Sequence, residues 1–315
     1  MLRLIYRVIF LTFLLTDMLN YNTISIACPD EQAVLNQGVW VLVNGGAHLH
    51  VGAINPQDEV VITNGRVCLS LVGSQQQRAG ILMEVRVKNQ WQPATSTYYG
   101  DWTYLGSSVI TQPTKVEVLS WSPREASIRW TFGNNIAGAE VGGVNSPYPF
   151  TKTVWLRRNE YGYFAWIEPL TELPRESWYL GVLSEHEIGF GGIWGPGTVQ
   201  TAEGLIYTQD LENTYEVNLS EEVDAADFRH SGDLFKRVLV PLPGGPFVVP
   251  VFAQATFGGV FIHHHVPLSY GAYLYAAPSK KAKSARAICK QAWRSAPFPL
   301  PRISPAELAT CGPEP

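Results

Sequence analysis

The nine-residue stretch 151–159, TKTVWLRRN, decides the fold, because its apolar residues recur with a period of two. Val154 and Leu156 fall on one side of an extended chain, whereas Trp155 and Arg157 fall on the other. This follows because successive side chains of a β-strand point in opposite directions. The pattern is typical of an antiparallel strand that buries one face.

The same period recurs along most of the chain. In 114–121, TKVEVLSW, the two valines oppose a lysine and a glutamate. Further runs of β-branched and aromatic residues are GVWVLVNG, EVVITNGRVCLSLVG, AGILMEVRV, ASIRWTFG, GYFAWIEPL, WYLGVLSEHEIGF and FKRVLVPL. Turn residues separate these runs, and the short turns at 64–65 and 159–162 suit β-hairpins. The sequence therefore predicts an all-β protein, a large antiparallel β-sandwich.

One stretch, 279–294 (SKKAKSARAICKQAWR), has the period of an amphipathic helix. Ser279 follows a proline and is expected to cap the helix. The expected apolar stripe consists of Ala282, Ala285, Ile288, Cys289 and Ala292. We expect this short C-terminal helix and the proline-rich tail after it, together 279–315, to pack on one sandwich domain formed by 28–278.

The first 27 residues have the pattern of a secretory signal peptide. Arg3 and Arg7 precede a short apolar run, and the small residues Ser25 and Ala27 stand just before Cys28. The apolar run is shorter than the roughly 20 residues that a membrane-spanning helix needs. We therefore expect cleavage after residue 27, a secreted extracellular protein and no membrane span after cleavage.

Export changes how the four cysteines are interpreted. Cys28, Cys68, Cys289 and Cys311 form an even set, which predicts two disulfides in an oxidising compartment. Three pairings are possible, and proximity in sequence favours Cys28 with Cys68 and Cys289 with Cys311. The chain has no CxxC spacing, so a structural zinc site of thiolates is disfavoured.

Charge and aromatic content restrict the class of partner. Without residues 1–27 the chain has 21 Lys and Arg against 26 Asp and Glu, a net charge of −5. This acidity argues against nucleic acid, which would require a basic face. The ten Trp and fourteen Tyr suit either a β core or a surface that holds a polysaccharide or oligosaccharide.

The order of elements resembles that of galactose mutarotase-like proteins. The stretch 60–95, VVITNGRVCLSLVGSQQQRAGILMEVRVKNQWQPAT, is similar to their opening hairpins. The stretch 151–190, TKTVWLRRNEYGYFAWIEPLTELPRESWYLGVLSEHEIGF, is similar to the region that carries their catalytic histidine, and His186 falls where that histidine would lie. The resemblance implies a β-sandwich of the supersandwich class, which polysaccharide lyases and accessory domains of glycosidases also use.

The sequence departs from this family on a late strand. Mutarotases have a carboxylate base there, whereas the stretch 258–269, GGVFIHHHVPLS, offers three consecutive histidines. The resemblance therefore implies the fold and does not carry the epimerase chemistry to this chain.

Alternation divides the three histidines between two faces of the expected strand. His263 and His265 share one face, about 7 Å apart, whereas His264 falls among apolar residues on the other. A second pair, His48 and His50 in GAHLHVG, repeats the spacing, with Leu49 and Val51 expected to point inward.

Three interpretations of these histidines stay open. In the first, they only occupy a solvated sheet face. Two His-x-His pairs on neighbouring strands would instead form an imidazole cluster for zinc or copper, with His48 and His50 as metal ligands. The third interpretation is acid–base catalysis on a sugar, because imidazole titrates near neutral pH.

A polysaccharide lyase that cleaves a uronate-containing glycan by β-elimination needs a base, an acid and a group that neutralises the uronate carboxylate. The candidates for proton transfer are His186, His263, His265, Tyr99 and Tyr163, and those for substrate binding are Arg129, Arg157, Trp102 and Asp101. Such an enzyme requires no cofactor, although a divalent metal is possible at the histidines.

Motifs of other enzyme classes are absent from the sequence. The chain has no Gly-x-Ser-x-Gly elbow, no phosphate-binding Gly-Lys loop, no His-Glu-x-x-His and no dinucleotide fingerprint. The leading hypothesis is a secreted carbohydrate-active protein, most simply a polysaccharide lyase. The alternatives are a non-catalytic carbohydrate-binding or cell-surface protein and a histidine-rich metal-dependent enzyme.

Overall fold

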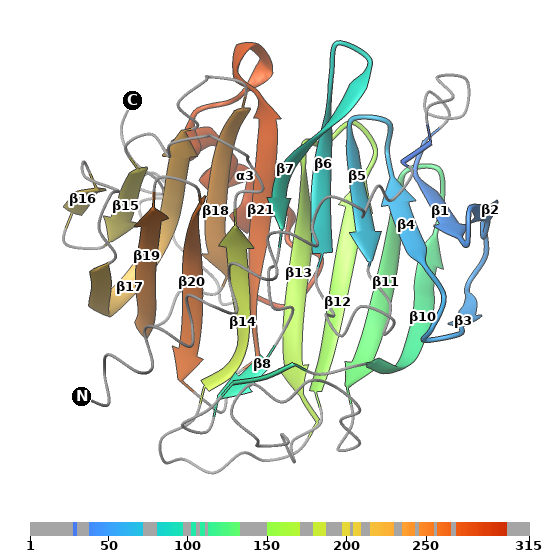
Figure 1. The fold of residues 1–315 in the computed structure, drawn as a ribbon, viewed down its shortest axis with the longest axis horizontal. Helices are drawn as coiled ribbons and strands as arrows, with labels where there is room; N and C mark the ends of the chain where they lie inside the picture. Colours follow the sequence, from blue (N-terminus) through green and yellow to red (C-terminus); the bar gives the residue numbers. More distant parts are fainter. Residues whose placement is uncertain are drawn as a thin grey trace.

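Two antiparallel β-sheets, A and B, stack face to face (Figure 1). The computed structural model describes residues 28–29, 38–71, 81–96, 102–104, 108–110, 113–132, 150–170, 179–186, 197–201, 204–208, 215–229, 235–242, 246–254, 257–265 and 269–300. The predicted all-β sandwich with a short helix near the C-terminus is confirmed.

Sheet A joins the N-terminal hairpins to strands from the second half of the chain. Its order is β2 (Gly46–Ala47), β1 (Trp40–Val43), β4 (Val60–Thr63), β5 (Val67–Leu71), β6 (Ile81–Val87), β7 (Gln90–Ser96), β14 (Tyr179–His186), β20 (Phe257–His265), β19 (Pro246–Gln254) and the first part of β17 (Tyr215–Arg229). The short strand β8 (Trp102–Tyr104) pairs with β14 on the same side as β7, and β9 (Ser108–Ile110) pairs with β8.

Sheet B contains the two strands whose alternation predicted the fold. Its order is β3 (Gly52–Ile54), β10 (Pro113–Trp121), β11 (Glu125–Phe132), β12 (Phe150–Arg157), β13 (Gly162–Pro169), β21 (Tyr270–Pro278), β18 (Phe235–Leu242), the second part of β17, β15 (Gly197–Thr201) and β16 (Gly204–Thr208). Because β17 pairs in both sheets, this one strand links them.

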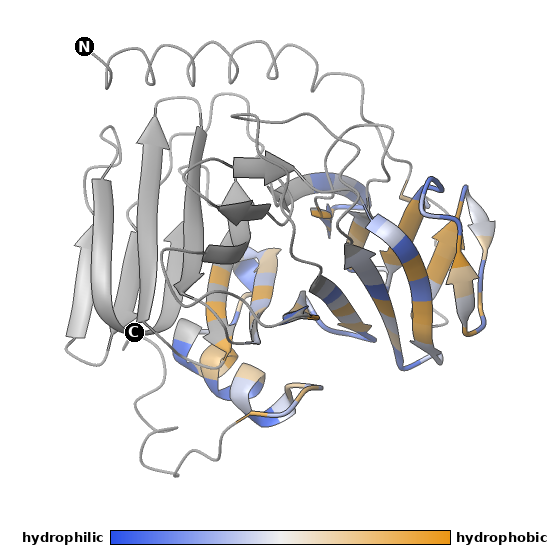
Figure 2. Ribbon diagram, turned by 90° about the horizontal axis from the view of Figure 1, so that it is seen from below, coloured by the Kyte–Doolittle hydropathy of each residue, from blue (hydrophilic) through white to orange (hydrophobic). Residues whose placement is uncertain are grey.

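The core lies between the two sheets, where the predicted inward residues are found. Val154 and Leu156 of β12, and Val116 and Val118 of β10, are buried. On the opposite face of β10, Lys115 and Glu117 form an ion pair at 2.7 Å. Figure 2 shows the resulting alternation of hydrophobic and hydrophilic bands along the strands.

Helix α3 (Ala285–Ser295) covers the outer face of sheet B. Ile288, Cys289 and Ala292 are fully buried against aromatic and aliphatic side chains of β13, β18 and β21. After the helix, Phe298 stacks on Trp166 with ring centroids 4.4 Å apart. The predicted apolar stripe is thus confirmed for Ile288, Cys289 and Ala292.

The start of the helix differs from the prediction. Residues Ser279–Lys281 form a 3₁₀ turn, η3, and the α-helix begins only at Ala285. Ser284, not Ser279, is the N-cap, because its hydroxyl oxygen accepts a hydrogen bond from the backbone N–H of Ala287 at 3.2 Å.

Both hairpin turns predicted from sequence are present. Gly65, between β4 and β5, has φ +80°, and Asn159, between β12 and β13, has φ +65°. These left-handed conformations suit glycine and asparagine. In the described part of the chain no helix has the length and apolar character to cross a membrane.

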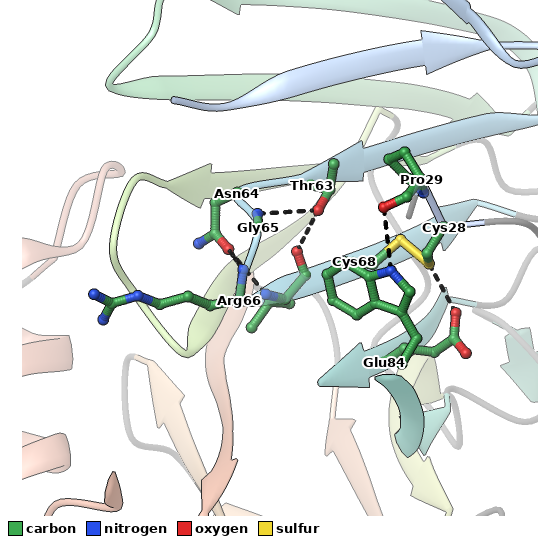
Figure 3. Close-up of a disulfide and its surroundings, with 10 residues drawn as sticks. Cys28, Pro29, Thr63, Asn64, Gly65, Arg66, Cys68 and Glu84 are labelled. Carbon is green, nitrogen blue, oxygen red and sulfur yellow. Dashed lines mark hydrogen bonds between the residues drawn. A yellow bond between two sulfur atoms is a disulfide. The ribbon is translucent and has the colours of Figure 1, made fainter. Parts of the chain in front are cut away.

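A disulfide joins Cys28 to Cys68, the pair that proximity in sequence favours (Figure 3). Cys289 is also disulfide-bonded. Its predicted partner, Cys311, lies outside the described residues.

Candidate functional site

Strands β14 and β20 bring the three predicted catalytic histidine positions into one part of sheet A. They pair directly, with Val182 opposite His263 and His186 opposite Gly259. Residues opposite one another in a sheet share a face, as do residues two apart along a strand. His186, His263 and His265 therefore occupy positions on one face, and His264 falls on the other, as the alternation predicts.

Along the strands these histidines form two groups. His263 and His265 are two residues apart, which separates their Cα atoms by about 7 Å. His186 pairs four residues further along β20, which places it about 13 Å from the level of His263. At that end its other neighbour is Ser96 of β7.

A row of titratable positions crosses three strands at the opposite end of β14 from His186. Tyr179 of β14 pairs with His265 of β20 on one side and with Tyr104 of β8 on the other. Neighbouring strands lie about 4.8 Å apart, so the row places one histidine position and two tyrosine positions at successive strand spacings. For these three strands the structure describes the backbone register and not the side chains.

A β-bulge in β14 produces this row. The register shifts by one residue between Tyr179 and Val182, so that Tyr179 pairs with His265. Bulges re-aim side chains and are frequent beside functional sites.

The other predicted residues are distributed differently. Trp102 lies at the start of β8, opposite Ile110 of β9. Tyr99 and Asp101 lie outside the described residues. Tyr163 is 1% exposed on β13, where it pairs with Leu274 and faces the core between the sheets. Tyr163 is thus a core residue of sheet B and is separated from the histidine positions of sheet A.

Arg129 and Arg157, the predicted carboxylate-binding residues, both belong to sheet B. The Nε atom of Arg129 donates to the hydroxyl of Thr153 at 3.3 Å. Both side chains fall on the face opposite the buried Ile128, Val154 and Leu156, which is the outer face of the sheet. The two arginines thus form no single site with the histidine positions of sheet A.

Arg157 is engaged within the protein. Its guanidinium forms an ion pair with Glu125, donates from Nη1 to the carbonyl of Ser295 at 2.6 Å and lies 5.2 Å from the centroid of the Phe164 ring. These contacts tie the end of α3 to the β11–β12 pair. Its predicted binding of a uronate carboxylate is untested.

A buried polar cluster adjoins this arginine. The Tyr273 hydroxyl donates to the Glu160 carboxylate at 3.2 Å. Burial raises the pKa of Glu160, although Arg157 and the Tyr273 hydrogen bond oppose this effect. Burial and the nearby Glu160 raise the pKa of Tyr273 well above its usual value. This phenol is thus held protonated and serves the packing of β13 on β21.

The segment 48–51 is not a strand, which corrects the alternation predicted for the second histidine pair. It connects β2 to β3, and Val51, expected to point inward, is 62% exposed. His48 and His50 stack with ring centroids 3.9 Å apart. Burial, and then the neighbouring His50, lower the pKa of His48. Metal binding by this pair is untested.

Among the residues with described side chains, one group of three possible metal ligands lies together, namely Cys28, Cys68 and Glu84. Both sulfur atoms are bonded to one another, so the group is a disulfide with an adjacent carboxyl and offers no thiolates.

Sequence reasoning missed three residues that the fold brings into view. Tyr179 stood in a quoted segment and Tyr104 lies two residues after the candidate Trp102, but nothing local shows that their strands pair. Lys152 is 0% exposed, with its ammonium 6.0 Å from the centroid of the Trp130 ring. The signal for Lys152 was present, because it shares the face of Val154 and Leu156, and a fully buried lysine is rare.

Comparisons with known proteins assign no family. No family model matches the chain, and no curated protein matches it. Among solved structures, the chain is similar to the α-N-acetylgalactosaminidase NagBb from Bifidobacterium bifidum in complex with GalNAc, with a TM-score of 0.47 and 11% sequence identity. The superposition covers 77% of this chain and 38% of NagBb. An α-mannosidase from Enterococcus faecalis V583 gives TM-score 0.45 and 8% identity over 87% and 40%.

The chain HI1317 gives TM-score 0.34 and 7% identity over 72% of this chain and 99% of that one. This chain thus spans about two fifths of the length of the two glycosidases. At these TM-scores we draw no conclusion from the likenesses about fold family or function.

Proposed function

We propose that this protein is a carbohydrate-active enzyme that cleaves a uronate-containing polysaccharide by β-elimination. The observation that carries the proposal is the row Tyr104, Tyr179 and His265 across β8, β14 and β20, with His263 two residues along the last strand. Imidazole and phenol can supply the base and the acid of such a reaction, and the row spaces these positions by one strand each.

The reaction follows from these groups. His265 or His263 removes the proton from the sugar carbon beside the uronate carboxyl. The electron pair of that C–H bond forms a C=C bond, and the C–O bond to the next sugar breaks. The leaving oxygen takes a proton from the phenol of Tyr179 or Tyr104. Neither step needs an oxidant, because the elimination is redox-neutral.

The test is an absorbance screen across uronate polymers, since the unsaturated uronate product absorbs in the ultraviolet. On the polymer that gives product, we expect His265→Asn to lower kcat about 100-fold or more, the usual effect of losing a general base or acid. His264→Asn is the matched control, because it changes the adjacent imidazole on the other face of β20 and should keep the wild-type rate.

Two results would contradict the proposal. If His265→Asn, Tyr179→Phe and Tyr104→Phe all keep full activity, the row is not the active site. If the protein is retarded on a polysaccharide gel but no polymer yields unsaturated product, it is a binding protein. Loss of activity to a chelator would instead favour a metal-dependent enzyme and the stacked His48 and His50.

We further infer that the protein is exported and that residues 1–27 are removed. The disulfide between Cys28 and Cys68, together with the disulfide-bonded state of Cys289, supports an oxidising compartment. N-terminal sequencing of the protein from its native source should begin at Cys28. Retention of residues 1–27 there would contradict the inference.

A further inference from the structure

Cys28 is fixed on the outer face of sheet A. Its sulfur is bonded to Cys68 of β5, and the carbonyl of the next residue, Pro29, accepts a hydrogen bond from the Trp91 indole N–H at 3.3 Å. Cys28, Cys68 and Val61 form a small buried cluster, with Leu42 and Trp91 packed against it. The main chain at Cys28 is therefore held in one place by two independent contacts.

The Glu84 carboxyl lies directly beside this point. Glu84 pairs with Cys68 across β5 and β6, and its Oε2 atom is 2.8 Å from the Cys28 sulfur (Figure 3). A disulfide sulfur carries no proton, so this contact is not a hydrogen bond from a thiol. The sulfur that it touches therefore donates no hydrogen bond that would stabilise an ionised Glu84 carboxylate.

No nearby cation stabilises this carboxylate among the described side chains. Burial raises the pKa of Glu84 to about 7, and no charged neighbour opposes that effect. Arg86 is two residues along the same strand, but its guanidinium lies 5.7 Å from the centroid of the Trp91 ring. On the partner strands Glu84 faces Cys68 and Pro93, which carry no charge.

We propose that cleavage after residue 27 completes an ion pair, in which the α-ammonium group created on Cys28 binds the Glu84 carboxylate. The main-chain nitrogen of a cysteine lies within about 4 Å of its own sulfur by covalent geometry. It is therefore within about 7 Å of Glu84 Oε2, and a change in the torsion angles of the flexible Glu84 side chain shortens this distance. Before cleavage that nitrogen is an uncharged amide.

This inference concerns the processed N-terminus and is independent of the proposed enzymatic activity. Its consequence is that the mature protein is stabilised relative to the precursor at neutral pH. With an amide at Cys28, Glu84 has a raised folded-state pKa, so stability is complete below about pH 4.5 and falls as the pH rises through about 7. A cation beside the carboxylate lowers that pKa by roughly 1 to 3 pH units and removes most of this loss.

The test compares two forms of the protein, one that begins at Cys28 and one that retains Ala27, each with Glu84 or with Glu84→Gln. We expect the form beginning at Cys28 to require more denaturant for unfolding at pH 7 than the form that retains Ala27. Glu84→Gln should abolish this difference, and at pH 4 the two forms should be equal. Glu59→Gln is the matched control, because this exposed carboxylate, one residue before β4, should leave the difference intact.

A second measurement, the chemical reactivity of the α-amino group, uses the wild-type protein and does not depend on a variant that folds. The α-amino group of the wild-type mature protein should acetylate about 4-fold or more slowly at pH 8 than after unfolding, since pairing raises its pKa from about 7.7 by one unit or more and so lowers the fraction of free amine. Equal stability of the two forms at all pH values, or an α-amino group of ordinary reactivity, would overturn the proposal. Neither result depends on where the native source cleaves the chain.

Discussion

At the scale of single residues, Asn64 connects the two sheets. Its Oδ1 atom accepts hydrogen bonds from the backbone N–H groups of Arg66 and Val67, both at 2.9 Å, and so closes the β4–β5 turn. Its Nδ2 atom donates to the carbonyls of Arg157 and Glu160, at 2.6 and 2.8 Å, in the β12–β13 turn. One amide thus satisfies two turns from different sheets.

We expect Asn64→Asp to lower the free energy of unfolding by about 2–4 kcal/mol. The aspartate keeps both acceptor bonds of the turn but loses both donors. The Glu160 carbonyl then loses the donor described for it, and the Arg157 carbonyl keeps only the longer bond from the Glu160 N–H at 3.4 Å. A buried carbonyl left without a partner costs about 1–3 kcal/mol, and the carboxylate oxygen that replaces Nδ2 has no proton to donate to either carbonyl. Chemical denaturation measures the loss. Asn55→Asp is the control, because the exposed Asn55 only accepts, from Gln57 N at 3.1 Å, and its carboxylate replacement still accepts.

A loss in Asn64→Asp no larger than that in Asn55→Asp would show that the donors of Asn64 contribute nothing. The sequence predicted two of the four hydrogen bonds that the Asn64 side chain makes. Asn64 followed by Gly65 is a hairpin signal, which accounts for the acceptor bonds. The donor bonds join positions more than 90 residues apart, and no local pattern can show them.

At the scale of secondary-structure elements, the alternation of apolar and polar residues predicted which face of a strand is buried, but it did not predict which strands pair. The buried residues of β10 and β12 are those that the period of two indicates, because burial of one face is a property of the strand itself. The neighbours of β14 and β20 are a property of the whole chain, so the row at Tyr179 could not be predicted. The alternation also gave a wrong prediction for 48–51, because β2 ends before this segment, β3 begins after it and the segment itself is not a strand.

Helix α3 shows how a tertiary contact moves a helix boundary. The backbone N–H of Lys283 donates to the Tyr275 hydroxyl of β21 at 3.1 Å. This bond ties the chain to the sheet one residue before the cap, so the α-helix begins after Ser284 although the helical pattern starts at Ser279. Propensity and pattern give the existence of the element, whereas its first residue is fixed by packing.

We expect Ser284→Ala to lower the free energy of unfolding by about 1 kcal/mol, the usual effect of removing a serine N-cap. The hydroxyl that accepts from Ala287 N would be lost, and that N–H would have no side-chain acceptor. Urea denaturation measures the change. Ser279→Ala, at the cap position that the sequence predicts, is the control and should leave stability unchanged. A larger loss at residue 279 would contradict the observed helix start.

At the scale of the whole molecule, contacts distant in sequence hold the sandwich together. Strand β17 pairs in both sheets, the β12–β13 turn binds the β4–β5 turn through Asn64, and α3 is tied to sheet B through Arg157. Gly162 marks one close approach, because a Cβ atom there would lie 2.6 Å from the Leu274 carbonyl oxygen. These contacts join segments from both halves of the chain.

The disulfide between Cys28 and Cys68 is the covalent counterpart of these contacts, and its removal tests how firmly the N-terminal segment is held. The bond closes a loop with a sequence separation of 40. In the chain-entropy description, opening a loop of this size lowers the free energy of unfolding by about 4 kcal/mol, because the unfolded chain regains conformations that the bond forbids. We expect Cys28→Ala combined with Cys68→Ala to show this loss in chemical denaturation.

The denaturant dependence of the unfolding free energy separates this mechanism from loss of packing. An open loop makes the unfolded chain less compact, so the slope should rise slightly while the native fold persists. Both sulfur atoms are also buried, and Glu84 would then face a small apolar gap in place of a disulfide. Adding Glu84→Leu to the double variant should fill that gap and recover part of the stability. If it recovers all of it, the loss arises from packing around Glu84, and the loop-closure explanation is wrong.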